Sequence, residues 1–248
     1  MASREKGGIW VALTAMLFRT GVWLAKCVYR GGENLPRQGG VILAMNHVSH
    51  FDPVVDAITV YRHERVPRVL AKDSVFRLPV LGLLAVKCGA VPVYRGSADA
   101  AQSLRAAVAA LDEGKLVLIY PEGTISKDPA GWPMRPRTGV ARLALDSRAV
   151  VIPCARWGTQ NILNGYTRKF RPLPRKRVDV VFGEPVDLSA YRGRPVTGPL
   201  LREVTEVIMG RVRDLVAEIR QEPPPAEYFR PPGTPDAEPP AEPTAGTG

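Results

Sequence analysis

The sequence predicts an α/β domain with a central, mostly parallel sheet flanked by helices. Apolar runs of strand length alternate along the chain with segments of helical periodicity, and this alternation is typical of such domains. The 248 residues suffice for one domain with appendages and a full core. With 45% hydrophobic and 23% charged residues, the composition is that of a globular protein.

The first half of the chain predicts three strands and one helix. Residues 39–46 (GGVILAMN) form an apolar run after two glycines, which is typical of a buried strand. Residues 68–72 and 86–94 predict two further strands. A helix is predicted over residues 97–114, with Ser97 as its cap and a glycine at its end. Its apolar face holds Ala101, Leu104, Val108 and Leu111.

The second half continues the alternation. Residues 115–123 predict a strand that runs into a loop, residues 139–147 predict a short helix, and residues 149–155 and 177–185 predict two more strands. A long final helix follows, because apolar residues recur there at spacings of three and four. They are Leu201, Val204, Ile208, Val212, Leu215 and Ile219.

Both ends differ from this body, so we predict three segments: residues 1–30, 31–221 and 222–248. The first is apolar and aromatic, but Arg19 and Lys26 interrupt it before it reaches the roughly 18 residues that a membrane-spanning helix needs. This pattern predicts a helical segment in a membrane interface, or alternatively a helix that packs on the core. The last segment is rich in Pro, Glu, Ala and Gly and is predicted to be disordered.

The charge and the cysteines narrow the classes of partner. A formal net charge of +10 and a pI of about 9.8 favour an anionic partner: nucleic acid, a membrane surface or a phosphorylated substrate. No helix-turn-helix, zinc-finger or RNP-like pattern is evident, which argues against nucleic acid. Cys27, Cys88 and Cys154 are far apart in sequence, so neither a disulfide framework nor a structural zinc site is expected.

The stretch NHVSHFDP, residues 46–53, holds two of the three histidines. It follows a predicted strand, at the end of the sheet where α/β proteins bind ligands. Asp52 lies five residues after His47, so its carboxylate can fix one imidazole nitrogen and leave the other as a base. The alternative is structural: Asp52 is the N-cap of a helix with Pro53 at N1, and His47 is a loop residue. A serine hydrolase that uses Ser49 is disfavoured, because the sequence has no Gly-x-Ser-x-Gly turn around this serine. A metal site is disfavoured as well, because too few ligand residues lie near these histidines in the sequence.

Two later strand ends carry further candidates. GAVPVYR, residues 89–95, ends in Arg95, whose planar guanidinium suits a phosphate. YPEGTIS, residues 120–126, offers the Glu122 carboxylate, a close backbone approach at Gly123 and the Thr124 hydroxyl. For either segment alone, a surface arginine or a simple turn is the favoured interpretation.

Taken together, these blocks resemble those of the glycerolipid acyltransferases, the lysophosphatidic acid acyltransferase family. NHVSHFD resembles Asn-His-x-Ser-x-x-Asp, GAVPVYR resembles Gly-x-x-x-x-x-Arg, and YPEGTIS resembles Phe-Pro-Glu-Gly-Thr-Arg-Ser. VVIPCA, residues 150–155, is similar to the fourth block, and the likeness spans roughly residues 32–185. Tyr120 stands where the family has Phe, and Ile125 replaces an arginine, for which Arg135 or Arg137 compensates.

The resemblance implies a glycerol-3-phosphate acyltransferase-like fold and an O-acyltransferase. The reaction would move a fatty acyl group from an acyl thioester to a hydroxyl of 1-acylglycerol 3-phosphate, giving phosphatidic acid in phospholipid biosynthesis. His47 would be the base and Asp52 would orient it. No metal and no bound cofactor are expected, because acyl-CoA or acyl-carrier protein serves as co-substrate. The implied substrate-binding residues are Asn46, Ser49, Arg95, Glu122, Gly123, Thr124 and Arg137.

The implied partners are the thioester donor, a lysophospholipid acceptor and an anionic membrane surface, but not nucleic acid. The implied location is the cytoplasmic face of a membrane, peripheral or monotopic. Glycerol 3-phosphate or another lysolipid is the alternative acceptor, and a non-enzymatic polyanion- or lipid-binding protein is the alternative from another class. For the dense basic run at residues 168–177 we expect either contacts with lipid headgroups or the donor's phosphates, or a solvated loop without a partner.

Overall fold

The fold is built on one central sheet. A computed structural model describes residues 5, 7–94 and 99–231 of the chain. In these residues seven strands pair in the order β1-β7-β6-β2-β5-β3-β4, and all neighbours are parallel except β6 and β7. The prediction of a mostly parallel central sheet is confirmed. The strands are β1 Ala25–Arg30, β2 Val41–Met45, β3 Pro67–Lys72, β4 Val91–Val93, β5 Leu116–Ile119, β6 Val150–Trp157 and β7 Lys176–Phe182.

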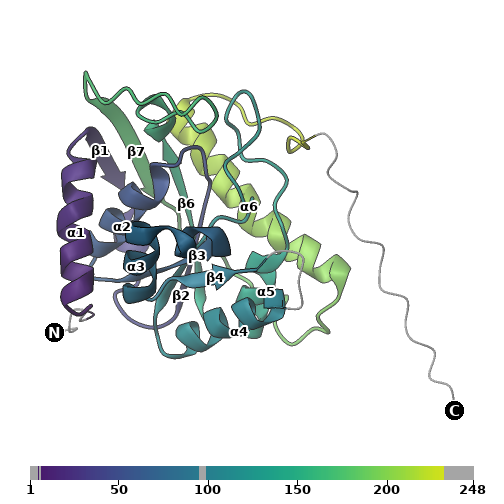
Figure 1. The fold of residues 1–248 in the computed structure, drawn as a ribbon. Helices are drawn as coiled ribbons and strands as arrows, with labels where there is room; N and C mark the ends of the chain where they lie inside the picture. The colour runs from purple at the N-terminus through teal and green to yellow at the C-terminus, as the bar shows by residue number, and fades with distance from the viewer. Residues whose placement is uncertain (1–4, 6, 95–98, 232–248) are drawn as a thin grey trace, which may run out of the picture.

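Helices cover the sheet as two separate groups (Figure 1). Helices α1, α2 and α3 are neighbours on one side, and α4, α5 and α6 lie together on the other. Their bounds are α1 Ile9–Val22, α2 Asp52–Arg62, α3 Pro79–Lys87, α4 Asp99–Asp112, α5 Gly139–Asp146 and α6 Gly198–Arg220. Short 3-10 helices occupy Gly32–Asn34, Asp73–Arg77 and Thr159–Asn161.

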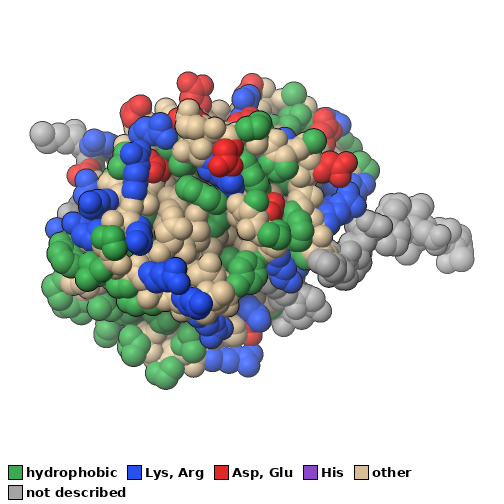
Figure 2. Space-filling model, turned by 90° about the horizontal axis from the view of Figure 1, so that it is seen from above, with side chains coloured by type: hydrophobic (Ala, Val, Ile, Leu, Met, Phe, Trp, Pro, Cys, Tyr) green, Lys and Arg blue, Asp and Glu red, His purple; other side chains and the backbone are tan. Residues whose placement is uncertain are grey.

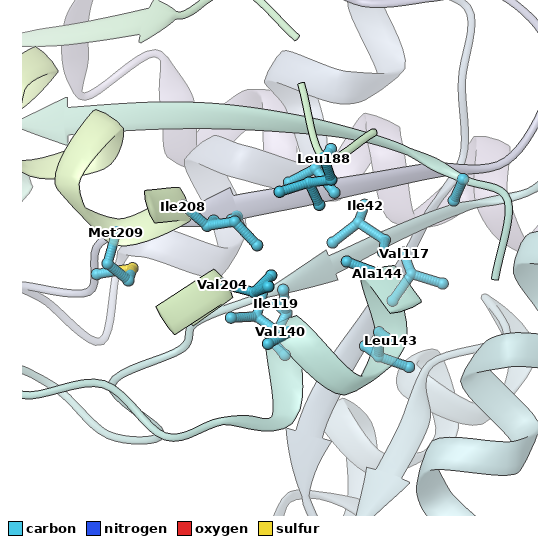
Figure 3. Close-up of a cluster of buried hydrophobic side chains, with 14 of the residues drawn as sticks. Ile42, Val117, Ile119, Val140, Leu143, Ala144, Leu188, Val204, Ile208 and Met209 are labelled. Carbon is cyan, nitrogen blue, oxygen red and sulfur yellow. The ribbon is translucent and has the colours of Figure 1, made fainter. Parts of the chain in front are cut away.

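Strand β2 lies at the centre and is buried along its whole length. Because successive side chains of a strand point to opposite faces, Ile42 and Ala44 pack towards α5 and α6, whereas Leu43 and Met45 pack towards α2. Figure 3 shows the first of these clusters, to which Ile42 of β2, Ala144 of α5 and Ile208 of α6 belong. A strand buried on both faces explains its continuous apolar run.

The predicted strand over residues 86–94 is wrong in its first part. Helix α3 continues to Lys87, and Gly89, at a φ of 73°, turns the chain into β4. The run LPVLGLLAV has no apolar period that separates helix from strand, and Pro79 in its first turn favours the helix. The helix predicted over residues 97–114 appears as α4, while Ser97 lies outside the described residues.

The ends of the chain also contribute to the folded body. Residues 25–30, which the sequence analysis grouped with the N-terminal segment, form β1 and pair with β7 at the sheet edge. The prediction of disorder from residue 222 is wrong for its first residues. Phe229 bridges to Met134, and Tyr228 packs against the core beside α6. Residues 232–248 lie outside the described part of the chain.

Candidate active site

The His47–Asp52 pair lies where β2 ends and α2 begins. His47 Nδ1 is 2.8 Å from Asp52 Oδ2, and the histidine side chain is 14% exposed while the aspartate is fully buried. Asp52 is the first residue of α2 and follows the N-cap, Phe51, so the predicted cap position is shifted by one residue. The backbone N–H groups of Val48 and Ser49 donate to the same carboxylate oxygen, so Asp52 is held rigidly. With Nδ1 paired, Nε2 is the nitrogen left to act as a base.

A buried arginine supports this aspartate. Arg156, on the neighbouring strand β6, is 0% exposed, and its Nη2 lies 2.6 Å from Asp52 Oδ2. Thr159 Oγ1 donates to the other carboxylate oxygen at 2.5 Å. Burial by itself would raise the pKa of Asp52, but Arg156 and the hydrogen bonds from His47 and Thr159 lower that pKa to about 2. The aspartate is therefore ionised at neutral pH and stabilises a protonated His47.

The same arginine also forms an ion pair with a second buried carboxylate. Its Nη1 is 2.5 Å from both oxygens of Asp56, which lies one helical turn after Asp52. Tyr120 donates its hydroxyl to Asp56 at 2.6 Å, and its ring stacks on the His47 ring with centroids 4.3 Å apart. Burial, and the neighbouring charge of Asp52, raise the pKa of Asp56 to about 6, although Arg156 acts to lower it. This network fixes both the carboxylate partner and the ring plane of His47.

Three residues predicted to bind substrate make hydrogen bonds within the protein. Asn46 pairs its side-chain amide with the backbone of Arg156 in both directions, at 2.9 and 2.8 Å. Ser49 Oγ donates to the carbonyl oxygen of Leu163. Glu122 accepts from the backbone N–H groups of His47, at 2.8 Å, and Met134, at 2.9 Å. All three are buried, and these bonds join the loop between β2 and α2 to distant segments.

The remaining predicted residues surround the turn after β5. Gly123 has a φ of 73°, and Thr124 is exposed next to it. Arg137 is exposed as well, and its backbone N–H donates to the carbonyl of Pro121, which brings it beside this turn. Ile125 points inward and is only 9% exposed. Arg95 lies outside the described residues, so its place at the site stays a prediction.

Sequence reasoning missed Arg156, Asp56 and Thr159. One signal was present: an arginine inside the apolar run VVIPCARW predicts a buried cation that needs a carboxylate partner. Its partners lie 100 and more residues earlier, so the sequence did not identify them. Among the described residues, no group of three or more His, Cys, Asp or Glu side chains is arranged to hold a metal ion.

The fold and this site define the class: an α/β enzyme with a His–Asp pair at the carboxyl end of a central parallel strand, where a general base can act. The family model described as acyltransferase matches residues 26–157, more than half of the chain. The protein belongs to this acyltransferase family.

Individual relatives agree with this assignment. The chain is 29% identical over 143 residues to a 1-acyl-sn-glycerol-3-phosphate acyltransferase of Borreliella burgdorferi, covering 56% of this chain and 55% of that protein. It is 24% identical over 190 residues to the enzyme of the same name from Bacillus subtilis, covering 76% and 87%. The crystal structure of the 1-acyl-sn-glycerophosphate (LPA) acyltransferase PlsC from Thermotoga maritima superposes with a TM-score of 0.63 at 24% identity, covering 84% and 80%.

The matched share of the relatives varies. The chain spans little more than half the length of several curated relatives, including 55% of the Borreliella protein and 57% of an uncharacterised protein of Mycobacterium leprae. The likeness to the Thermotoga structure concerns the fold.

Proposed function

We propose that the protein transfers a fatty acyl group from an acyl thioester to a hydroxyl of 1-acylglycerol 3-phosphate and so forms phosphatidic acid. The observation that carries the proposal is the 2.8 Å pair of His47 with a fully buried, ionised Asp52. Two relatives named for this reaction support the choice of substrate. The exposed Arg137 and Thr124 beside the Gly123 turn supply a cation and a hydroxyl for the acceptor's phosphate.

The chemistry follows from the geometry. His47 Nε2 removes the proton from the acceptor hydroxyl as its oxygen attacks the thioester carbonyl. Asp52 stabilises the imidazolium that forms. The tetrahedral intermediate then collapses, the carbon–sulfur bond breaks, and the thiolate leaves and takes up the proton. The oxygen ester is the product, and His47 is neutral again.

An apolar cavity of ≈ 150 Å³ supports the binding of an acyl chain near this base. It lies between α1, α2, β3 and α3, and its lining includes Phe18 of α1, Leu84 of α3 and Ala57 of α2. Pro53, directly after Asp52, also lines it. A chain in this cavity would therefore end close to the His–Asp pair.

The test is a donor-by-acceptor screen with purified protein and mass spectrometry of the products. Each donor, acyl-CoA and acyl-carrier protein, is combined with 1-acylglycerol 3-phosphate, glycerol 3-phosphate and other lysolipids. We expect phosphatidic acid as the main product.

Glycerol 3-phosphate or another lysolipid is the second candidate acceptor. The inward-facing Ile125 stands where the family pattern has an arginine, so one cation of this block is absent. Failure of every combination would favour a non-enzymatic polyanion- or lipid-binding protein.

Arg95→Ala is expected to weaken binding of the acceptor. The family resemblance places Arg95 in the phosphate-binding block, and loss of a charge-assisted hydrogen bond costs on the order of 2 kcal/mol, or roughly thirtyfold in affinity. The measurement is the acceptor KM, with Arg105→Ala, an exposed arginine of α4, as the control. An unchanged acceptor KM with a raised donor KM would assign Arg95 to the donor instead.

We further propose that α1 and α3 dock the protein on the surface of an anionic membrane. Ile9 and Met16 of α1 are 72% and 65% exposed, and Val80 and Val86 of α3 are 63% and 60% exposed. In the view from above, basic side chains lie beside a hydrophobic area at the left of the molecule (Figure 2). Within the described residues, no helix is both long and apolar enough to cross a membrane.

Replacing Ile9, Met16 and Leu17 by glutamine is expected to release the protein from anionic vesicles. Full burial of such a side chain is worth about 1.5–3 kcal/mol, so partition should fall more than roughly tenfold. The measurement is co-sedimentation with vesicles, and Val196→Gln, another exposed apolar residue, is the control. Salt should weaken only the electrostatic part of the attraction. Equal vesicle binding by the triple variant and the wild type would contradict this surface.

A further inference from the structure

A polar cleft of ≈ 530 Å³ lies between the β6–β7 loop and the start of β7. It is distinct from the apolar cavity, because its lining is basic and amide-bearing. The lining residues on which the argument rests are Gln160, Asn161, Asn164, Lys169, Arg171 and Lys176.

Three cations of this cleft are uncompensated. Within the described part of the chain, no carboxylate lies within ion-pair distance of Lys169, Arg171 or Lys176. Arg177, on the same rim, differs, because it makes two hydrogen bonds to Asp179 at 2.8 and 2.7 Å. Like charges gathered in one hollow repel each other, and a bound anion relieves that repulsion.

The amides of the cleft add hydrogen-bond donors. Gln160 Oε1 accepts from the backbone of Gly158, and Asn164 Oδ1 accepts from the backbone of Tyr166 and Thr167. Since these oxygens are used inside the loop, the side-chain NH₂ groups of Gln160 and Asn164 are the parts of these amides that a ligand can use, as donors. A site rich in donors and cations selects a ligand rich in acceptors, and phosphate groups fit this description.

The loop that forms the cleft also contacts the active site. Thr159, at its start, donates to Asp52, and the carbonyl of Leu163 accepts from Ser49. Backbone hydrogen bonds from Asn164 to Lys169 and from Arg171 to Ile162 fold the loop on itself. The cleft is therefore held in a fixed position relative to His47.

We propose that this cleft binds the phosphate groups of coenzyme A when the donor is an acyl-CoA. The inference rests on the proposed function. In acyl-CoA the pantetheine arm separates the phosphates from the thioester, so a phosphate site belongs beside the catalytic centre and not in it. A hollow lined by three amides also suits the nucleotide end of coenzyme A. The acidic surface of a carrier protein would instead require a broad exposed basic face.

The test removes the three uncompensated cations together, as Lys169→Gln, Arg171→Gln and Lys176→Gln. The KM for acyl-CoA is expected to rise at least about tenfold, since each lost charge-assisted contact weakens binding. Turnover of an acyl-pantetheine thioester, which lacks the phosphates, should be unchanged. The control variant carries Arg148→Gln, Arg202→Gln and Arg211→Gln, three exposed arginines elsewhere, and removes the same net charge.

The other outcomes are distinguishable. Equal losses with acyl-CoA and acyl-pantetheine would overturn the proposal, as would an unchanged KM for both. An unchanged KM for acyl-CoA with weaker binding to anionic vesicles would assign the cleft to lipid headgroups. If the wild type shows no transfer, the proposed function fails, and calorimetric titration with coenzyme A itself still tests the cleft. Weaker binding of coenzyme A by the triple variant supports the site, and equal binding overturns it. Lys169→Gln with Arg171→Gln replaces the triple variant if that protein does not fold.

Discussion

Replacement of His47 by alanine is expected to abolish acyl transfer while the protein remains folded. The imidazole pairs Nδ1 with the buried Asp52 and leaves Nε2 as the base, so its loss removes the proton acceptor. The backbone bonds from Val48 and Ser49 to Asp52, which hold the loop, do not involve the His47 side chain. Asp52→Asn should lower kcat by roughly three to four orders of magnitude, as expected for a carboxylate that orients a catalytic histidine. The measurements are product formation by mass spectrometry and the circular dichroism spectrum.

His50→Ala is the matched control for His47. It lies in the same loop, three residues further on, but its side chain is exposed. Its turnover is expected to stay near that of the wild type. Near-normal turnover by a folded His47→Ala protein would refute the general-base mechanism and favour the binding-protein alternative.

Arg156→Met is expected to lower the free energy of unfolding by about 3 to 5 kcal/mol, because it leaves Asp52 and Asp56 as uncompensated buried charges. The measurement is the urea midpoint near neutral pH. Adding Asp56→Asn should restore part of the loss, since one of the two unpaired carboxylates is then removed.

Arg177→Gln provides the contrast for this stability measurement. Its partner Asp179 is 11% exposed, but the Arg177 side chain is 69% exposed, so solvent screens the pair and its loss should cost much less stability than Arg156→Met. If Arg156→Met costs no more than Arg177→Gln, the buried network does not stabilise the fold. If Asp56→Asn gives no recovery, the cost of Arg156→Met arises from lost packing and not from unpaired charge.

The parts of the fold that the sequence predicted correctly depend on local pattern. Strand β2 is a continuous apolar run, and α6 repeats its apolar residues along most of its length, so neighbouring residues suffice to identify each. Helix α3 was missed because its run is apolar on every side. Strand β1 was missed because only its pairing with β7, about 150 residues later, makes it part of the sheet.

The same distinction applies to the site. The relation of His47 to Asp52 lies within six residues and was predicted. The sequence did not indicate that the Glu122 carboxylate accepts from two backbone donors, one of them Met134, twelve residues later. Arg156 reaches the aspartates only because β6 lies beside β2 in the sheet. Contacts of this kind depend on strand order, which periodicity and composition do not specify.

The direct passage from α1 into β1 has a mechanical consequence. Only Trp23 and Leu24 separate the last residue of α1 from the first residue of β1. Arg175 contacts both sides of this junction, because its guanidinium lies over the Trp23 ring and donates to the carbonyl of Ala25. In the proposed membrane-bound state, α1 is therefore rigidly joined to the sheet and is not connected to it by a flexible linker. The height and tilt of His47 above the lipid are set by the fold, so lipids must diffuse to a stationary opening.

The same junction matters for truncated forms of the protein. A shortened chain that begins at residue 31 would lack β1 and expose the unpaired edge of β7, which promotes aggregation. Solubilising the protein thus calls for polar residues on the outer face of α1 and not for its removal.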